Sequence, residues 1–252
     1  NVWWAAGKGT FGTEELVNRV QLLGLDGLVN HRRLILPQLG APGVAAHEVK
    51  KQSGFTVVYG PVRAADIKGF LDADCEATAE MRQVQFSLAD RIVLTPMELV
   101  YSGKYLLAAL LLIIALSPLG RGGYRFDLLL TRGLMSAVLL LSAYVAGAVV
   151  GPALLPWLPG RGFSVKGAVV GILAATIASL LNLTGPPLET GAWLLLSAAV
   201  ASFMTMNFTG ASTYTSLSGV KTEMKIAVPL QAVAAAVGLI LFVIAGFLRA
   251  AP

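Results

Sequence analysis

The chain begins with a segment whose residue types could hold a flat ligand close to the backbone. It reads NVWWAAGKGTFG, two adjacent tryptophans followed by alanines and glycines. Small side chains let another molecule approach the backbone, and glycine allows the closest approach. Trp3 is explained equally well as a core residue. The candidate binding residues are Asn1, Trp3, Trp4, Ala5, Ala6, Gly7, Lys8, Gly9 and Thr10.

Two glycine-containing loops, PQLGAPG and GPVRA, form a second candidate site. Glycine permits positive φ as well as close approach, and a helix following each loop would favour an anionic group at its N-terminus. Neither loop is a GxGxxG or P-loop motif, so simple tight turns explain them about as well. The candidate residues are Gln38, Leu39, Gly40, Ala41, Pro42, Gly43, Gly60 and Pro61.

Residue types that ligate metals are scarce. The chain has two histidines and one cysteine, which cannot form a spaced Cys/His cluster or an intramolecular disulfide. We interpret His31 as a loop residue, His47 as a solvated helix residue, and Cys75 as a surface or half-buried thiol. The sequence therefore predicts no metal site built from protein side chains alone.

The elements that position these residues alternate between helix and strand. TEELVNRVQLLG predicts a helix capped by Thr13 and ended by Gly24. A strand at Leu34–Leu36, a helix in VAAHEVKKQSG, a strand in FTVVYGP and a helix in RAADIKGFLDA follow. QVQFSLADRIVLTP contains alternating, strand-like positions. This order predicts a three-layer, Rossmann-like α/β head with parallel strands, whose ligand binds beyond the strands' carboxyl ends, where both glycine loops lie.

Composition divides the chain into a soluble and a membrane half. The hydrophobic content is 56%, the charged content 13% and the mean hydropathy +0.71, which is too apolar for one soluble domain. Lys and Arg number 11 before Tyr105 and 8 from there on, whereas Asp and Glu number 11 and 3. The basic residues form no phosphate-tracking stripe, so we expect no nucleic-acid binding.

The second half contains five apolar stretches that are candidates for membrane-spanning helices. Small residues in GAVVGILAATIAS suit close helix packing, and GPALLPWLP should kink or end the second stretch. The stretches are Tyr105–Leu119, Leu134–Leu158, Val165–Leu183, Gly191–Phe208 and Ile226–Leu248. We expect domains at 1–98 and 99–252, joined in a multi-pass protein of the cell (inner) membrane.

Charge does not decide the orientation of these spans. Loops on the side of the head hold four basic residues and those on the other side hold four, so the positive-inside rule is balanced. We expect a cytoplasmic head because no export signal is visible. No charged residue lies in the middle of a predicted span, which disfavours transport. The two sets are Arg161, Lys166, Lys221, Lys225 and Arg121, Arg125, Arg132, Arg249.

The opening motif resembles the cap-helix segment of the mercury-methylating corrinoid protein family (HgcA), which reads N-(V/I)-W-C-A-A-G-K. The resemblance continues through LILPQLGAPGVAAHEVKKQSGFTVVYGPVRAADIKGFL and LTPMELV, and through MNFTGAST and SGVKTEMK in the membrane half. It covers nearly the whole chain and is specific, because a corrinoid-type head fused to about five spans is a rare combination. The head is also similar to the large subunit of the corrinoid iron–sulfur protein of the acetyl-CoA pathway, which lacks the membrane domain.

The resemblance implies a corrinoid-dependent methyltransferase. Its Rossmann-like head, of which this chain is expected to lack an N-terminal part, would hold cobalamin and pass a methyl group to inorganic mercury(II). The implied partners are a ferredoxin-like iron–sulfur protein (HgcB type) as reductant and a methylated folate-type donor protein. Ala5, Ala6 and Gly7 would let the corrin lie flat, and Asn1, Lys8 and Thr10 could meet its amides.

Trp4 departs from the family at its most important position, where the family has a cobalt-ligating cysteine. The indole nitrogen is a donor only, so Trp4 cannot ligate cobalt. Either Trp4 stacks on the corrin and leaves cobalt without a protein ligand, or its bulk excludes the corrin. The alternatives to mercury methylation are therefore a corrinoid-binding methyl carrier or redox module, an inactive paralogue, and a membrane transport or scaffold protein.

Overall fold

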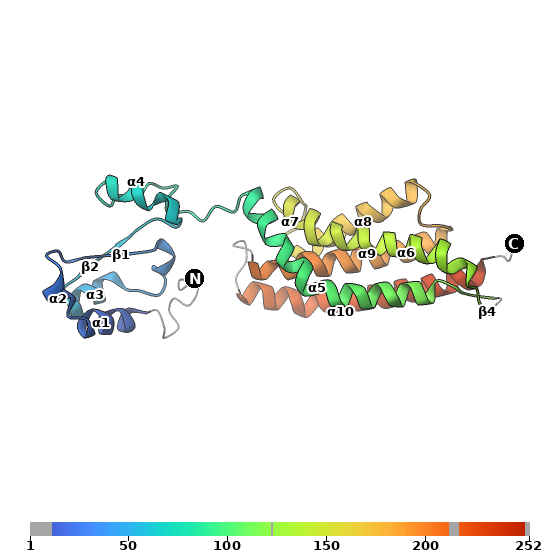
Figure 1. The fold of residues 1–252 in the computed structure, drawn as a ribbon, viewed down its shortest axis with the longest axis horizontal. Coiled ribbons are helices and arrows are strands. Elements are labelled where there is room, and N and C mark those ends of the chain that lie inside the picture. The colour runs from blue at the N-terminus through green and yellow to red at the C-terminus, as the bar shows by residue number, and fades with distance from the viewer. Residues whose placement is uncertain (1–11, 122, 212–216, 250–252) are drawn as a thin grey trace. The chain divides into compact units, whose positions relative to one another are not determined.

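The computed structural model describes residues 12–121, 123–211 and 217–249. The chain forms two compact units, Asn1–Gln85, here the head unit, and Phe86–Pro252, here the membrane unit (Figure 1). The predicted boundary between residues 98 and 99 falls inside a continuous helix, α5 (Leu88–Leu116). The unit that contains the membrane helices therefore begins before the predicted membrane domain.

The head unit alternates helices with two short strands. These strands, β1 (Arg33–Leu36) and β2 (Thr56–Tyr59), pair in parallel with Leu34 opposite Val57 and Leu36 opposite Tyr59. The remaining elements are α1 (Thr13–Leu22), α2 (Leu25–Leu28), η2 (Gln38–Gly40), α3 (Ala46–Ser53), η3 (Ala64–Asp66) and α4 (Ile67–Asp72). The three predicted helices, the strands at Leu34–Leu36 and in FTVVYGP, and the parallel pairing of these two strands are confirmed. The described residues of this unit form a two-stranded sheet, which is less than the predicted three-layer Rossmann-like fold.

The core of the head unit lies between the sheet and the helices α1 and α3. Because strand side chains alternate between faces, Leu36 and Val57 point to the same side, where Val17 of α1 and Val49 of α3 cover them. Phe70 of α4 is fully buried as well. These apolar contacts hold the carboxyl ends of β1 and β2 in place.

Two local predictions, one in the head unit and one at its boundary with the membrane unit, are wrong. Thr13 does not cap α1, whose N-cap is Gly12; its Oγ1 instead accepts a hydrogen bond from the Ala45 N–H at 2.9 Å. The predicted strand in QVQFSLADRIVLTP is also absent, because Ser87 and Asp90 form a capping box that starts α5 at Leu88. Gly24 adopts the left-handed conformation directly after α1, as its prediction as a helix stop requires.

The membrane unit is a helical bundle with one small hairpin, β3 (Leu119–Gly120) and β4 (Gly123–Tyr124). Five helices of the described chain are long and apolar enough to cross a membrane, which confirms the five predicted spans: Leu88–Leu116, Leu129–Leu154, Phe163–Leu180, Pro187–Asn207 and Gly219–Leu248. They comprise α5, the segment η4 (Leu129–Gly133), α6 (Leu134–Val145), η5 (Ala146–Val150) and α7 (Gly151–Leu154), then α8 (Phe163–Leu180), α9 (Pro187–Asn207) and α10 (Leu217–Leu248).

Small residues let the central helices α8 and α9 approach closely. A Cβ added to Gly167 would lie 2.7 Å from Cβ of Thr205, and one added to Gly171 would overlap the carbonyl of Ser197. The apolar core beside them contains Trp193 and Phe242, whose rings meet edge to face at 5.8 Å. The prediction that small residues serve helix packing therefore holds for these glycines.

Candidate functional site

Parallel pairing brings the two predicted loops to one edge of the head sheet. Because β1 and β2 run in the same direction, the loop after Leu36 and the loop after Tyr59 leave from the same edge. The Tyr59 hydroxyl donates a hydrogen bond to the Val44 carbonyl, and the Gly60 N–H donates to the Leu36 carbonyl at 2.7 Å. The two loops are thus fixed to one another at the place where α/β proteins bind ligands.

The loop after β1 is a compact turn with little free backbone. The N–H of Gly40 donates to the Pro37 carbonyl at 2.8 Å, and the N–H of Gly43 donates to the Gly40 carbonyl at 3.0 Å. Gly40 is buried, Pro42 is exposed, and the other candidates in this loop are half-buried. Surface for a ligand therefore comes from Gln38, Leu39, Ala41, Pro42 and Gly43.

The glycines of these two loops do not adopt backbone conformations with positive φ. Gly40, Gly43 and Gly60 are absent from the described glycines with positive φ. Gly60 is needed for packing instead, since a Cβ there would lie 3.3 Å from Ile35 Cγ2 and 3.5 Å from Phe70 Cε1. Gly60 and Pro61 are both buried. The freedom for positive φ that glycine offers is therefore not used at Gly40, Gly43 and Gly60.

The opening segment, with the predicted binding residues Asn1, Trp3, Trp4, Ala5, Ala6, Gly7, Lys8, Gly9 and Thr10, lies outside the described residues.

Among the described residues, no group of three or more His, Cys, Asp and Glu is placed to hold a metal ion. His31 is exposed, His47 is exposed on α3, and Cys75 is a half-buried free thiol.

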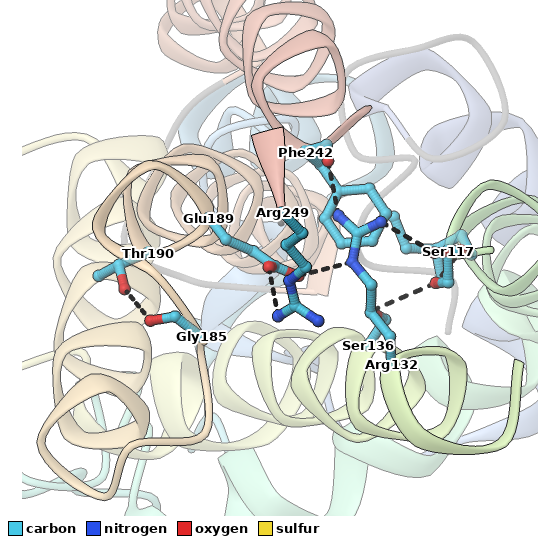
Figure 2. Close-up of polar contacts among 9 residues, drawn as sticks. Ser117, Arg132, Ser136, Gly185, Glu189, Thr190, Phe242 and Arg249 are labelled. Atoms are coloured by element: carbon cyan, nitrogen blue, oxygen red, sulfur yellow. Dashed lines mark hydrogen bonds and ion pairs between the residues drawn. The ribbon is translucent and has the colours of Figure 1, made fainter. Parts of the chain in front are cut away.

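The membrane unit holds a buried charge cluster that sequence reasoning missed. Nε of Arg132 donates to Oε1 of Glu189 at 2.9 Å, and these side chains are only 2% and 3% exposed. Arg249, one-third exposed, donates to Oε2 of Glu189 at 2.8 Å. Figure 2 shows Arg132 and Arg249 converging on this one carboxylate. The sequence interpretation placed Arg132 in a loop, whereas it lies in the helical segment η4.

The remaining donors of Arg132 bind carbonyl groups of two further helices. Nη1 donates to the carbonyl of Ser117, just beyond α5, at 2.8 Å, and Nη2 donates to the carbonyl of Phe242 in α10 at 2.6 Å (Figure 2). Its guanidinium carbon also lies 4.0 Å from the centroid of the Phe242 ring. A Cβ on Gly246 would fall 2.7 Å from Nη1, so Gly246 makes room for the guanidinium. This cluster joins helix ends and is a structural clamp.

A signal for this cluster was present in the sequence. With five alternating spans, residues 132, 189 and 249 all fall at the same end of the bundle, and opposite charges at one end of a low-dielectric bundle are expected to pair.

Comparisons of the chain with protein-family models, with curated proteins and with solved structures gave no match.

Proposed function

We propose that the chain is a membrane-anchored corrinoid protein whose head binds cobalamin at the edge where β1 and β2 end. The observation that carries this proposal is the parallel pairing of the two strands, which places Gln38–Gly43 and Gly60–Pro61 at one edge. Ligands of parallel α/β units bind at such an edge. The resemblance of these loops and of the opening segment to the mercury-methylating family supplies cobalamin as the ligand.

The candidate residues could contact the flat corrin ring, but they include no side chain expected to ligate cobalt. Leu39, Ala41 and Pro42 offer a small, largely apolar surface for a flat ring. Trp4 offers no lone pair to cobalt. Cys75 follows α4 in a left-handed conformation, with φ of 67°, and its N–H is bonded to the Phe70 carbonyl. We therefore expect bound cobalamin without a sulfur ligand from the protein.

The inherited activity is transfer of a methyl group to mercury(II). Cobalamin supplies the cobalt–methyl bond for such chemistry when it is bound. The head would position the corrin face, and the membrane unit would hold the protein in the inner membrane with the head in the cytoplasm. A ferredoxin-like iron–sulfur protein would serve as reductant and a methylated folate-type protein as methyl donor.

Trp4 itself favours a second candidate, a corrinoid-binding carrier or redox module that does not methylate mercury. A cysteine at position 4 would supply the cobalt of bound cobalamin with an electron-donating thiolate, which would favour methyl transfer, and Trp4 cannot supply one. Formation of methylmercury by cells producing this protein, well above cells with an empty vector, would reject the second candidate.

The test is the visible absorption spectrum of the detergent-purified protein after reconstitution with cobalamin, compared with its Trp4→Cys variant. We expect both proteins to retain cobalamin and only the variant to show a thiolate-ligated spectrum. Retention by the variant alone would mean that the Trp4 side chain blocks the site. Failure of both proteins to retain cobalamin would reject the corrinoid proposal.

A further inference from the structure

The membrane unit has an open groove between α5, α6, α9 and α10 that the corrinoid proposal does not use. Its volume is about 650 Å³, and most of the side chains that line it are apolar. The exposed rings of Tyr101, Tyr105 and Phe203 form part of its walls. Such a groove accepts hydrocarbon in a membrane, so the charged residues at its polar end determine which lipid it selects.

This polar end of the groove lies at the membrane surface. The helix α9, which forms one wall, has 21 residues from Pro187 to Asn207, a length of about 30 Å at the helical rise per residue. That length equals the hydrocarbon thickness of a bilayer, so Asn207 lies at the level of the lipid head groups. Nδ2 of Asn207 donates to Oε1 of Glu98 at 3.1 Å, which places the Glu98 carboxylate at the same level.

A lysine of α10 lies at this level too. The helices α9 and α10 run antiparallel and are joined by the hydrogen bond from Gln231 to Ser202. From this bond, Asn207 is five residues further along α9, and Lys225 is six residues back along α10. Both helices rise by the same distance per residue, so Lys225 is level with Asn207 to within about one residue.

The helical period places two lysines on the wall that α10 contributes to the groove. Val228 and Ala232 line the groove. Lys225 precedes Val228 by one turn, and Lys221 precedes it by two turns, so both lysines lie on this same face of α10. Both are exposed. The mouth of the groove therefore presents two ammonium groups on α10 and one carboxylate, that of Glu98, on α5.

This combination of charges specifies the head group of the bound lipid. Lysine ammonium groups bind a phosphate, whereas the Glu98 carboxylate repels a phosphate and attracts a cation. Because Glu98 accepts only one hydrogen bond from Asn207, it retains acceptor sites for a donating cation. The ammonium of ethanolamine donates such hydrogen bonds. The methylated nitrogen of choline has no N–H to donate, and the glycerol head group of phosphatidylglycerol has no cation.

We propose that the groove binds one molecule of phosphatidylethanolamine. Its phosphate lies at Lys221 and Lys225, its ammonium donates to the carboxylate of Glu98, and one acyl chain follows the apolar walls. This lipid matches both signs of charge at the mouth.

The test is native mass spectrometry of the full chain in detergent, titrated separately with the dioleoyl forms of phosphatidylethanolamine, phosphatidylcholine and phosphatidylglycerol. Since the acyl chains are identical, differences in affinity report the head group. We expect the first copy of phosphatidylethanolamine to bind about tenfold more tightly than either other lipid, through its hydrogen bonds to Glu98. This comparison uses the wild type, so it stands even where a substitution unfolds the protein.

Three variants locate the head group. Glu98→Gln removes the carboxylate charge but keeps an oxygen for Asn207, and it should abolish the preference for phosphatidylethanolamine over phosphatidylcholine. The double variant Lys221→Gln/Lys225→Gln should weaken the binding of all three lipids about tenfold. Arg161→Gln is the matched control and should bind like the wild type. It removes an exposed cation just before α8, at the end where α8 bonds to α10, but outside the groove.

Four results would overturn the proposal. Equal binding of phosphatidylethanolamine and phosphatidylcholine by the wild type would mean that the groove holds acyl chains without selecting a head group. Tighter binding of phosphatidylglycerol would mean that the lysines select an anionic lipid. A folded Glu98→Gln variant that keeps the preference, or a folded double lysine variant that binds like Arg161→Gln, would place the head group elsewhere. Cobalamin takes no part in the experiment, so failure here is distinct from failure of the corrinoid proposal.

Discussion

Arg132 and Glu189 lie almost fully shielded in a chain with little charge in its membrane half. Moving each charge out of water is expensive, and their attraction repays this only because the other donors of Arg132 bind carbonyls and Arg249 shares the carboxylate. Removal of Glu189 would leave Arg132 buried without a counter-charge, whereas removal of Arg132 would leave Glu189 with Arg249 alone and the Ser117 and Phe242 carbonyls without this donor. The pair therefore makes the bundle sensitive to single substitutions at this point.

Arg132→Met should destabilise the membrane unit by about 3–5 kcal/mol. The free energy of unfolding, measured in detergent with a chemical denaturant, tests this expectation. Arg125→Met is the control, because Arg125 pairs with Asp127 at the surface, and it should show no measurable change. If Arg132→Met were as stable as Arg125→Met, the cluster would not clamp the helix ends.

Tyr59 has a comparable role in the head unit on a smaller scale. Its hydroxyl holds the Val44 carbonyl beyond the loop after β1, so Tyr59→Phe removes one hydrogen bond between the two candidate loops. We expect a loss of about 1 kcal/mol in the stability of the head and weaker cobalamin retention. Thr56→Val, at an exposed position of the same strand, is the control. Equal cobalamin retention by both variants would show that the loops do not depend on this bond.

At the scale of elements, two helical glycines predict opposite effects of the same substitution. A Cβ on Gly171 of α8 would overlap the Ser197 carbonyl, whereas a Cβ on Gly191 of α9 would meet no atom within 4 Å. Gly171→Ala should therefore cost about 1–3 kcal/mol through overpacking. Gly191→Ala should be neutral or stabilising by up to about 1 kcal/mol, because alanine favours helix. Thermal unfolding of both variants in the same detergent makes the comparison.

The same elements show why some local structure could be predicted and some could not. Apolar periodicity and glycine stops located β1, β2, α1 and α3 correctly. The residues before α5 were assigned to a strand because their apolar residues alternate, although Ser87 and Asp90 carry the capping-box spacing. The cap determined the outcome, since it satisfies helix N–H groups that a single unpaired strand would leave exposed.

Contacts between distant residues were harder to predict than elements. Local pattern placed the two glycine loops at the sheet edge, because parallel strands require it. The hydrogen bond from Tyr59 to Val44, the role of Gly60 in packing and the convergence of Arg132, Glu189 and Arg249 all depend on tertiary neighbours. No spacing rule within one helix or strand specifies such neighbours.

At the scale of the membrane unit, side-chain contacts show that successive spans alternate in direction. At one end of the bundle, Arg132 links the end of α5, the start of α9 and the end of α10. At the other end, Arg91 near the start of α5 donates to the carbonyl of Ala153 in α7, and Glu223 of α10 accepts from Ser164 of α8. Five alternating spans place residue 161 on the side of Leu88 and residue 121 on the opposite side.

The charge distribution does not decide which side of the membrane the Leu88 end of the bundle faces. The sequence count was four basic residues on each side. Arg132 is buried in η4 and paired with Glu189, so it no longer counts as a loop charge. On the side of Leu88, however, Lys166 lies within α8, and Lys221 and Lys225 lie within α10. The count of basic loop residues therefore gives the positive-inside rule no clear direction, and the cytoplasmic head stays a prediction.

Cysteine labelling tests this topology directly, because Cys75 is the only cysteine of the chain. In a Cys75→Ser background, Arg121→Cys should react with a membrane-impermeant maleimide in intact cells, and Arg161→Cys should react only after permeabilisation. Both positions are exposed, so equal labelling after permeabilisation is the control for reactivity. Reaction of both cysteines from the same side would contradict the single membrane span, Leu129–Leu154, that separates residues 121 and 161. Reaction of Arg161→Cys alone in intact cells would keep the five spans and reverse the proposed orientation, which would place the head, and with it any cobalamin, outside the cytoplasm.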